Sequence, residues 1–214
     1  GSEVPSIGGE SGVAVSQDGV VFGRNMFFDA DFLDVSRVEV LRGPQGTISG
    51  RNATGGGINV YSNQPTESFE GQVKATIGDY NRFATETYLS GPLIGDSVLG
   101  RLALSTENAD GFFNNTFLNE EADDKDKVHA RAYLLAHPSD NVEVRLILEG
   151  MLDRSTPQSS FTIGRARPDM PSLEEIFNVA APDFDALEFQ ADQSQSGRKE
   201  QFGTTLGLTW NLSP

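Results

Sequence analysis

The amino-acid sequence predicts a mainly β protein, in which a small α+β unit precedes a longer series of antiparallel strands. Two observations indicate this fold class. Residues 1–66 are Gly-rich and hold only short apolar pieces, whereas residues 67–214 alternate apolar and polar side chains with a period of two, the pattern of strands with one apolar face. Short and long connections also separate the alternating segments. We therefore expect a domain boundary directly after Thr66.

The first unit is expected to begin with a hairpin. Asp18-Gly19, a dipeptide favoured in tight hairpin turns, joins the apolar pieces at Val13–Val15 and Val20–Phe22. Further along, Asp31 is placed to cap a short helical turn that extends through Leu33. These elements are short, so the first unit is expected to be small.

Two longer strands follow in the first unit. Ser36–Arg42 is bounded by the breaker Gly43-Pro44, and Ile58–Ser62 follows a Gly-rich stretch. Pro44–Asn52 between them is expected to form a short helical or irregular turn. Glycine permits backbone conformations and close approaches that other residues forbid, and four glycines are expected to serve this purpose: Gly43, Gly55, Gly56 and Gly57. The stretch lacks the Lys-[Ser/Thr] ending of a P-loop and the spacing of a Rossmann fingerprint, which argues against nucleotide binding.

The second unit holds six alternating segments. In the first of them, Val73, Ala75 and Ile77 lie on one face of the predicted strand, and Gln72 and Lys74 lie on the other. Such segments are expected to have one apolar and one polar face, although the second, Phe83 to Ser90, alternates less cleanly. The six segments begin at Phe69, Phe83, Val98, Val128, Val142 and Phe202.

The lengths of the connections point to a membrane barrel. The links through Asp96 and Ser139 are short, whereas the stretches at 107–127 and 154–199 are long. Antiparallel strands with short turns at one end and long loops at the other are typical of an outer-membrane β-barrel, whose short turns face the periplasm. The negative mean hydropathy of −0.34 does not argue against this, because a barrel wall is apolar on one face only.

Composition excludes several classes of partner and chemistry. The formal net charge of −15 would repel a phosphate backbone, so nucleic acid is not expected as a partner. The chain has no cysteine, which excludes disulfides, thiolate metal sites and thiol nucleophiles. It also has no run of about 18 apolar residues, the length that a membrane-spanning helix requires.

A family resemblance appears in the first unit and continues into the second. The sequence from Val38 to Thr47, continued from Ser49 to Val60, resembles the end of the plug domain of TonB-dependent receptors. A Pro-containing linker, Gln64-Pro65-Thr66, follows, and then Phe69-Glu70-Gly71, which resembles the first barrel strand of that family. Ser90-Gly91-Pro92-Leu93 resembles the family's first periplasmic turn. The resemblance covers roughly residues 12–153, and beyond the motifs it rests on the strand pattern.

The resemblance implies a fold and a role. Residues 1–66 would be the C-terminal part of the plug domain, and residues 67–214 would be about the first six strands of a plugged transmembrane antiparallel β-barrel. In the intact protein, the implied role is active uptake of a scarce nutrient across the outer membrane of a Gram-negative bacterium. The nutrient is most often an iron–siderophore complex, although haem, cobalamin or a carbohydrate is also compatible.

The resemblance also implies the partners, and it leaves one rival. The energy-transducing protein TonB would act through an N-terminal segment that this sequence lacks, and outer-membrane lipid would surround the barrel. Because that segment, the first part of the plug and most of the barrel are missing, the fragment itself is not expected to transport. The rival interpretation is a soluble β-sandwich that binds a ligand or a carbohydrate, in which the apolar faces pack on each other.

Four charged residues are candidates for a latch between plug and barrel: Arg37, Glu39, Arg42 and Arg51. The interior of a membrane barrel is polar, and the resemblance implies that plug arginines pair with glutamates on the wall, with Arg42 as the best match. Breaking such a buried pair is costly, so it can hold the plug in place. The alternative is that these residues form ordinary solvated salt bridges.

A second group of candidates concerns the ligand. By resemblance, Arg24, Asn25, Phe27 and Phe28 fall near the outward tip of the plug, where ligand is contacted. Paired aromatic rings and an arginine suit a planar, anionic metal chelate. The alternative is that the two phenylalanines only pack inside the plug.

Neither a catalytic site nor a resident metal or cofactor is expected. The acidic stretch Glu120–Asp126 lacks the spacing of an EF-hand loop and is interpreted as a solvated loop, with calcium binding left open. His129 and His137 lie eight residues apart, so they cannot bind one metal locally. The sequence contains no HExxH motif and no nucleophile elbow. The predicted function is therefore binding coupled to passage.

Overall fold

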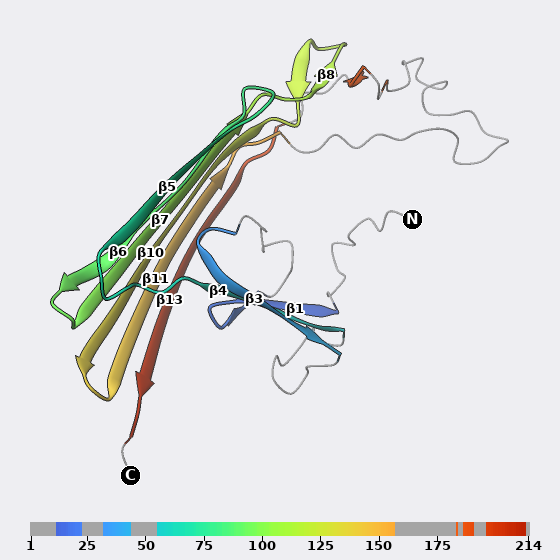
Figure 1. Cartoon of the computed structure of the whole chain (residues 1–214). Coiled ribbons are helices and arrows are strands. Elements are labelled where there is room, and N and C mark those ends of the chain that lie inside the picture. Colours follow the sequence, from blue (N-terminus) through green and yellow to red (C-terminus); the bar gives the residue numbers. More distant parts are fainter. Residues whose placement is uncertain are drawn as a thin grey trace.

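The computed structural model describes residues 12–22, 32–43, 55–156, 183, 186–190 and 196–212. The described residues form three β-sheets of four, six and three strands. Figure 1 shows the six-stranded sheet as a tall, tilted wall, with the four-stranded sheet against one of its faces and the label β8 near one end. We call the six-stranded sheet the wall and the four-stranded sheet the small sheet.

The small sheet has the strand order β2-β1-β4-β3. Strand β1 pairs with β2 in an antiparallel hairpin and with β4 in parallel, and β3 pairs with β4 in an antiparallel arrangement. The hairpin turn is Asp18-Gly19, and both residues have positive φ (49° and 86°), as a two-residue type I′ turn requires. The strands span β1 Val13–Gln17, β2 Val20–Val21, β3 Val35–Arg42 and β4 Gly56–Ser62.

The strands predicted for the first unit are confirmed to within two residues, but the helical turn is not. Phe32 and Leu33 are not helical, and no described residue of the chain lies in a helix. Asp34 adopts a left-handed conformation with φ of 51°, so a right-handed helix does not continue through it. Asp31 and the predicted turn at Pro44–Asn52 lie outside the described residues.

The wall has the strand order β13-β11-β10-β7-β6-β5, and every neighbouring pair is antiparallel. The six strands correspond to the six alternating segments of the sequence. Short turns join β6 to β7 and β10 to β11, and both turns lie at the end of the wall opposite β8 (Figure 1). The strands span β5 Glu70–Ile77, β6 Phe83–Ile94, β7 Val98–Ala109, β10 Lys125–Ser139, β11 Val142–Asp153 and β13 Lys199–Trp210.

The two faces of the wall differ in chemistry. On the outer face, Leu89 pairs with Leu102, Leu102 with Ala132, and Ala132 with Leu148, and the three leucines are exposed. On the inner face, charged and apolar side chains are buried together beneath the small sheet. They include Arg101, Ala103, Arg131, Tyr133 and Ile147.

The open apolar face bears on the rival interpretation of the sequence. A soluble sandwich would bury this face under a second sheet. The part of the chain that the structure describes places no sheet there, since the small sheet lies on the polar face (Figure 1). The fold is thus that of a barrel wall with a domain packed on its inner side.

Long connections extend one end of the wall. Strand β8, Phe113–Asn115, pairs with β9, Glu120–Ala122, and with β12, Glu188–Phe189, in a three-stranded sheet. The acidic stretch of the sequence is therefore partly β-strand rather than a free loop. Among the described residues, no helix has the length and apolar character needed to span a membrane.

Candidate functional site

The contact between the small sheet and the wall is centred on a buried ion pair. Arg101 of β7 donates from Nε and Nη2 to the two carboxylate oxygens of Asp34 at 2.6 and 2.7 Å. The two side chains are only 5% and 8% exposed. The Arg101 guanidinium also stacks 3.9 Å from the ring centre of Tyr88, and its Nη1 donates to Glu70 at 3.1 Å. All three guanidinium nitrogens of Arg101 therefore have an acceptor.

A second wall arginine, Arg131, binds Leu33, the residue before Asp34. Arg131 of β10 is buried, and its Nη1 donates to the backbone carbonyl of Leu33 at 2.5 Å. Its Nε and Nη2 donate to the Glu149 carboxylate of β11 at 3.3 and 2.9 Å. Two arginines from neighbouring wall strands thus grip two consecutive residues, and we call this arrangement the Leu33–Asp34 clamp.

Asp34 is also tied to the end of the small sheet. Its backbone carbonyl accepts a hydrogen bond from the Asn63 amide, and its carboxylate accepts one from Asn63 Nδ2, both at 2.9 Å. A few residues later the chain docks on the wall again, where Thr66 hydrogen-bonds Ser90 through its amide and its hydroxyl. The clamp therefore lies beside the covalent connection between the small sheet and the wall.

The hairpin of the small sheet makes longer contacts with the wall. Gln17 Nε2 donates to Glu149 at 3.3 Å, and Arg145 Nη2 donates to the carbonyl of Asp18 at 3.3 Å. Glu149 is shared, because His129 Nε2 also lies 2.7 Å from it. The other ring nitrogen of His129 is buried and has no hydrogen-bond partner among the described residues.

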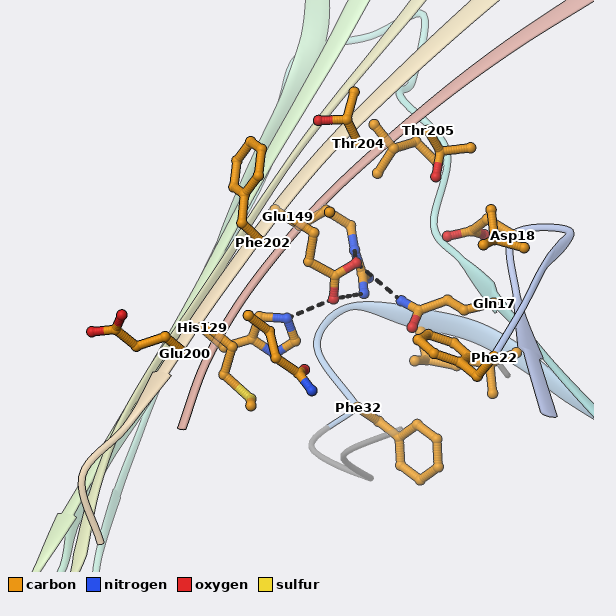
Figure 2. Close-up of a pocket in the computed structure, with 18 residues that line it drawn as sticks. Gln17, Asp18, Phe22, Phe32, His129, Glu149, Glu200, Phe202, Thr204 and Thr205 are labelled. Carbon is orange, nitrogen blue, oxygen red and sulfur yellow. Dashed lines mark hydrogen bonds and ion pairs between the residues drawn. The ribbon is translucent and has the colours of Figure 1, made fainter. Parts of the chain in front are cut away.

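A cavity of about 440 Å³ lies between the hairpin and the wall. Figure 2 shows Gln17, Asp18 and Phe22 on one side of it, facing His129 and Glu149, with Thr205 of β13 nearby. The lining combines aromatic rings with a carboxylate, an imidazole and hydroxyls. A cavity with these polar groups in its lining is better suited to holding water than to being a dry apolar space.

Two of the residues predicted to form the latch pair with each other. Arg37 Nε donates to Glu39 at 2.8 Å, and the two side chains are 56% and 42% exposed. Arg37 also lies over the ring of Tyr61 at 3.7 Å. The hydrogen bond from Arg37 lowers the pKa of the Glu39 carboxyl below its ordinary value. This pair lies within the small sheet and does not join it to the wall.

The other predicted residues are only partly described. Arg42 is exposed and forms no ion pair with any residue that the structure describes, so the six wall strands do not supply its partner. Arg51 lies outside the described residues, as do the ligand candidates Arg24, Asn25, Phe27 and Phe28. Their proposed roles remain predictions.

The four glycines do not share one role. Gly43 and Gly56 have positive φ, 86° and 145°, whereas Gly55 and Gly57 do not. A Cβ on Gly56 would overlap the carbonyl oxygen of Leu41. Gly56 thus allows β3 and β4 to approach closely, which is the role predicted for this stretch.

Two carboxylates of the acidic stretch have protein partners. The carboxylate of Asp124 accepts hydrogen bonds from the amide and the hydroxyl of Thr156 at 2.5 and 2.6 Å, and Asp123 lies 3.5 Å from Lys125. Within the described ranges, no group of three or more His, Asp or Glu side chains is arranged to hold a metal ion.

Sequence reasoning missed the clamp. Arg101 and Arg131 are identifiable from the sequence only as polar positions opposite an apolar face, and nothing in the pattern singles out Asp34. One signal is available: arginines on the inner face of two predicted strands need a buried partner. The sequence does not identify that partner, because Asp34 lies 67 residues from Arg101.

Comparisons with known proteins agree with this architecture. The family model of the TonB-dependent receptor plug domain matches residues 1–57. The pesticin receptor of Yersinia pestis is 36% identical over 78 residues, which are 36% of this chain and 12% of that receptor. The vitamin B12 transporter BtuB of Photobacterium profundum is 30% identical over 171 residues, which are 77% of this chain and 27% of the transporter.

A solved structure shares the fold. The crystal structure of the ferric yersiniabactin uptake receptor FyuA from Yersinia pestis superimposes with a TM-score of 0.62 at 27% identity, over 68% of this chain and 23% of FyuA. The chain therefore spans between 12% and 27% of the length of these three relatives.

Proposed function

The chain belongs to the family of TonB-dependent receptors, and on that basis we propose that it supplies the end of the plug and the first six barrel strands of a nutrient-uptake receptor. The family's receptors reside in the outer membrane of Gram-negative bacteria, and this chain is an outer-membrane protein of that type. We propose a boundary after Thr66 between plug and barrel, because Thr66 contacts Ser90 of the wall directly.

One observation carries the proposal. The outer face of the wall is apolar and exposed, while its inner face is polar and covered by the small sheet. Lipid is the solvent that suits an exposed apolar face, and a plugged barrel lumen suits a polar inner face. The small sheet then acts as part of the closure of the pore.

We propose an iron–siderophore complex as the transported ligand. Two relatives bear on this class: FyuA is described as a ferric yersiniabactin uptake receptor, whereas BtuB, described as a vitamin B12 transporter, makes cobalamin the main competitor. Passage would require the partner TonB to pull on the plug from the periplasmic side. The residues of this chain would bind and block, without covalent chemistry.

The test is uptake by the complete receptor that carries this sequence. Cells that depend on it as their only receptor are given radiolabelled ferric siderophores of the catecholate, hydroxamate and phenolate classes, and separately labelled cobalamin. We expect saturable uptake of one ferric siderophore that disappears when TonB is deleted. Uptake of cobalamin alone would reject the siderophore proposal, and equal uptake without TonB would reject the receptor proposal.

A further inference from the structure

We propose that the Leu33–Asp34 clamp is the contact through which the wall keeps the plug in its pore-closing position. In this contact Asp34 is the residue that positions the plug on the wall. The inference rests on the proposed function, since it assigns the closure of the pore to particular side chains. The arrangement is the opposite of the one predicted from the sequence, in which plug arginines pair with wall glutamates. In the clamp the arginines belong to the wall, and the acceptors belong to the plug.

Burial and geometry make the Asp34–Arg101 pair a strong contact. A planar guanidinium that donates two parallel hydrogen bonds to a carboxylate forms one of the stronger polar interactions in proteins. Here both side chains are almost fully buried, Glu70 accepts a further hydrogen bond from Arg101, and Asn63 donates a further one to Asp34. Removing the Asp34 charge would leave buried Arg101 with Glu70 as its remaining carboxylate, at 3.1 Å. Disrupting a buried pair from one side is strongly unfavourable.

The backbone of Asp34 depends on the same contacts. Its φ of 51° lies in the left-handed region, which costs a non-glycine residue free energy unless its surroundings stabilise it. The surroundings are Arg101 on the carboxylate, Arg131 on the preceding carbonyl, and Asn63 on both the carboxylate and the backbone carbonyl. If the wall releases the carboxylate, the segment loses what holds it in this conformation.

The hairpin cannot replace the clamp. Its contacts with Glu149 and Arg145 are both 3.3 Å long, beyond the usual range for a good N–H···O hydrogen bond. Behind it lies the cavity of about 440 Å³, lined by both the hairpin and the wall. Without the clamp, this cavity is where the plug can separate from β10, β11 and β13 and let water and solutes pass.

The experiment measures leak in cells that express the complete receptor. Asp34→Asn keeps the size of the side chain and its tolerance of left-handed φ, but it removes the charge. Losing one partner of a buried pair shifts an equilibrium by a factor on the order of 100, so the unclamped fraction should rise by about that factor. We expect these cells to become sensitive to vancomycin, which does not pass the intact outer membrane.

Glu86→Gln is the matched control. Glu86 also pairs with a basic residue, Lys74 at 2.8 Å, but both side chains are more than half exposed and belong to the wall. This variant should leave vancomycin resistance unchanged. Arg101→Lys, which keeps the charge but loses the two-pronged geometry, should give sensitivity between the wild type and Asp34→Asn.

The outcomes separate the clamp from the proposed function. The assay uses no transported ligand, so it stays informative if the siderophore assignment fails. Normal amounts of Asp34→Asn receptor in the outer membrane with unchanged vancomycin resistance would overturn the proposal, as would equal sensitivity of the Glu86→Gln cells. If Asp34→Asn does not accumulate, the same readout on Arg101→Lys decides, and its full resistance at normal abundance would reject the clamp.

Discussion

Gly56 and Gly43 flank the same pair of strands, but they are constrained for different reasons. Gly43 has φ of 86°, and a Cβ at this position would meet no atom within 4 Å, whereas Gly56 combines φ of 145° with the close carbonyl of Leu41. Conformational strain alone acts at Gly43. At Gly56 strain and steric overlap act together, because Leu41 pairs with Gly57 and Arg42 with Gly56 in the ladder.

This difference gives the first residue-scale prediction. Gly56→Val should prevent the small sheet from folding, because backbone strain of about 1–3 kcal/mol adds to a clash that only a backbone shift can relieve. Gly43→Asn should be tolerated, since Asn adopts positive φ more readily than other residues. Protease resistance of residues 12–62 in the complete receptor measures both. Equal resistance of the two variants would contradict the prediction.

The second residue-scale prediction concerns the Arg37–Glu39 pair. Because the pKa of Glu39 is lowered in the folded chain, the pair stabilises the fold above the ordinary pKa of a glutamate. That contribution is lost as the pH falls through the lowered value. Arg37→Ala should return the Glu39 pKa to its ordinary range, as followed by NMR titration of the side-chain carboxyl. Both side chains are exposed, so the effect on stability should be small.

A control for this titration is available in the wall. Lys74→Ala removes a cation of similar exposure from a different sheet, and it should leave the Glu39 titration unchanged. If the Glu39 pKa does not change in Arg37→Ala, the hydrogen bond from Arg37 is not the cause of the lowered pKa.

At the scale of elements, alternation along a strand decides where a charge is tolerated. Val73 lies on the outer face of β5 and is exposed, while its neighbour Gln72 lies on the inner face, opposite Tyr88. The two positions are adjacent in sequence, but they meet different solvents if the outer face contacts lipid. Strand β5 thus offers a direct test of the membrane assignment.

Val73→Arg should destabilise the inserted barrel by about 2–4 kcal/mol near the bilayer midplane, whereas Gln72→Arg should have little effect. Unfolding of the complete receptor in lipid vesicles, followed by the gel shift between folded and unfolded barrel, measures the difference. If both substitutions cost the same, the outer face of β5 does not contact lipid.

At the scale of the whole molecule, the described part of the chain exposes an apolar face, and its six-stranded sheet ends in two edge strands. Leu206, Leu208 and Trp210 on β13 are each more than half exposed, and burial of apolar surface is worth about 25 cal/mol per Å². Strands β5 and β13 are the edge strands of the wall among the described residues, and sheet edges can pair with strands of another chain. Both features favour covering by lipid, by detergent or by other copies.

We therefore expect the 214-residue chain to self-associate in detergent-free buffer and to be dispersed by detergent. Light scattering with and without detergent measures this directly, and binding of an apolar dye reports the exposed face. A stable monomer in plain buffer that binds no dye would contradict the membrane assignment.

The amino-acid sequence is sufficient to assign the apolar side of the wall strands that alternate cleanly, which excludes β6. Side chains alternate strictly along a strand, so Val73 and Gln72, or Leu102 and Arg101, can be placed on opposite faces without knowing the fold. The hairpin at Asp18-Gly19 is also accessible, because local backbone preferences control it. Phe32 and Leu33, which were predicted to end a helical turn, are not helical. The Leu33 carbonyl instead accepts a hydrogen bond from Arg131 of the wall, a contact that local sequence does not reveal.

The residues that join the small sheet to the wall are known only from the packed fold. The sequence suggests plug arginines, yet Arg37 pairs within its own strand, and wall arginines reach residues 67 and 98 positions away in the chain. Such contacts depend on the register of β7 and β10 and on how the small sheet docks. Alternation fixes the direction of a side chain, but the partner it meets there is set by packing between distant segments.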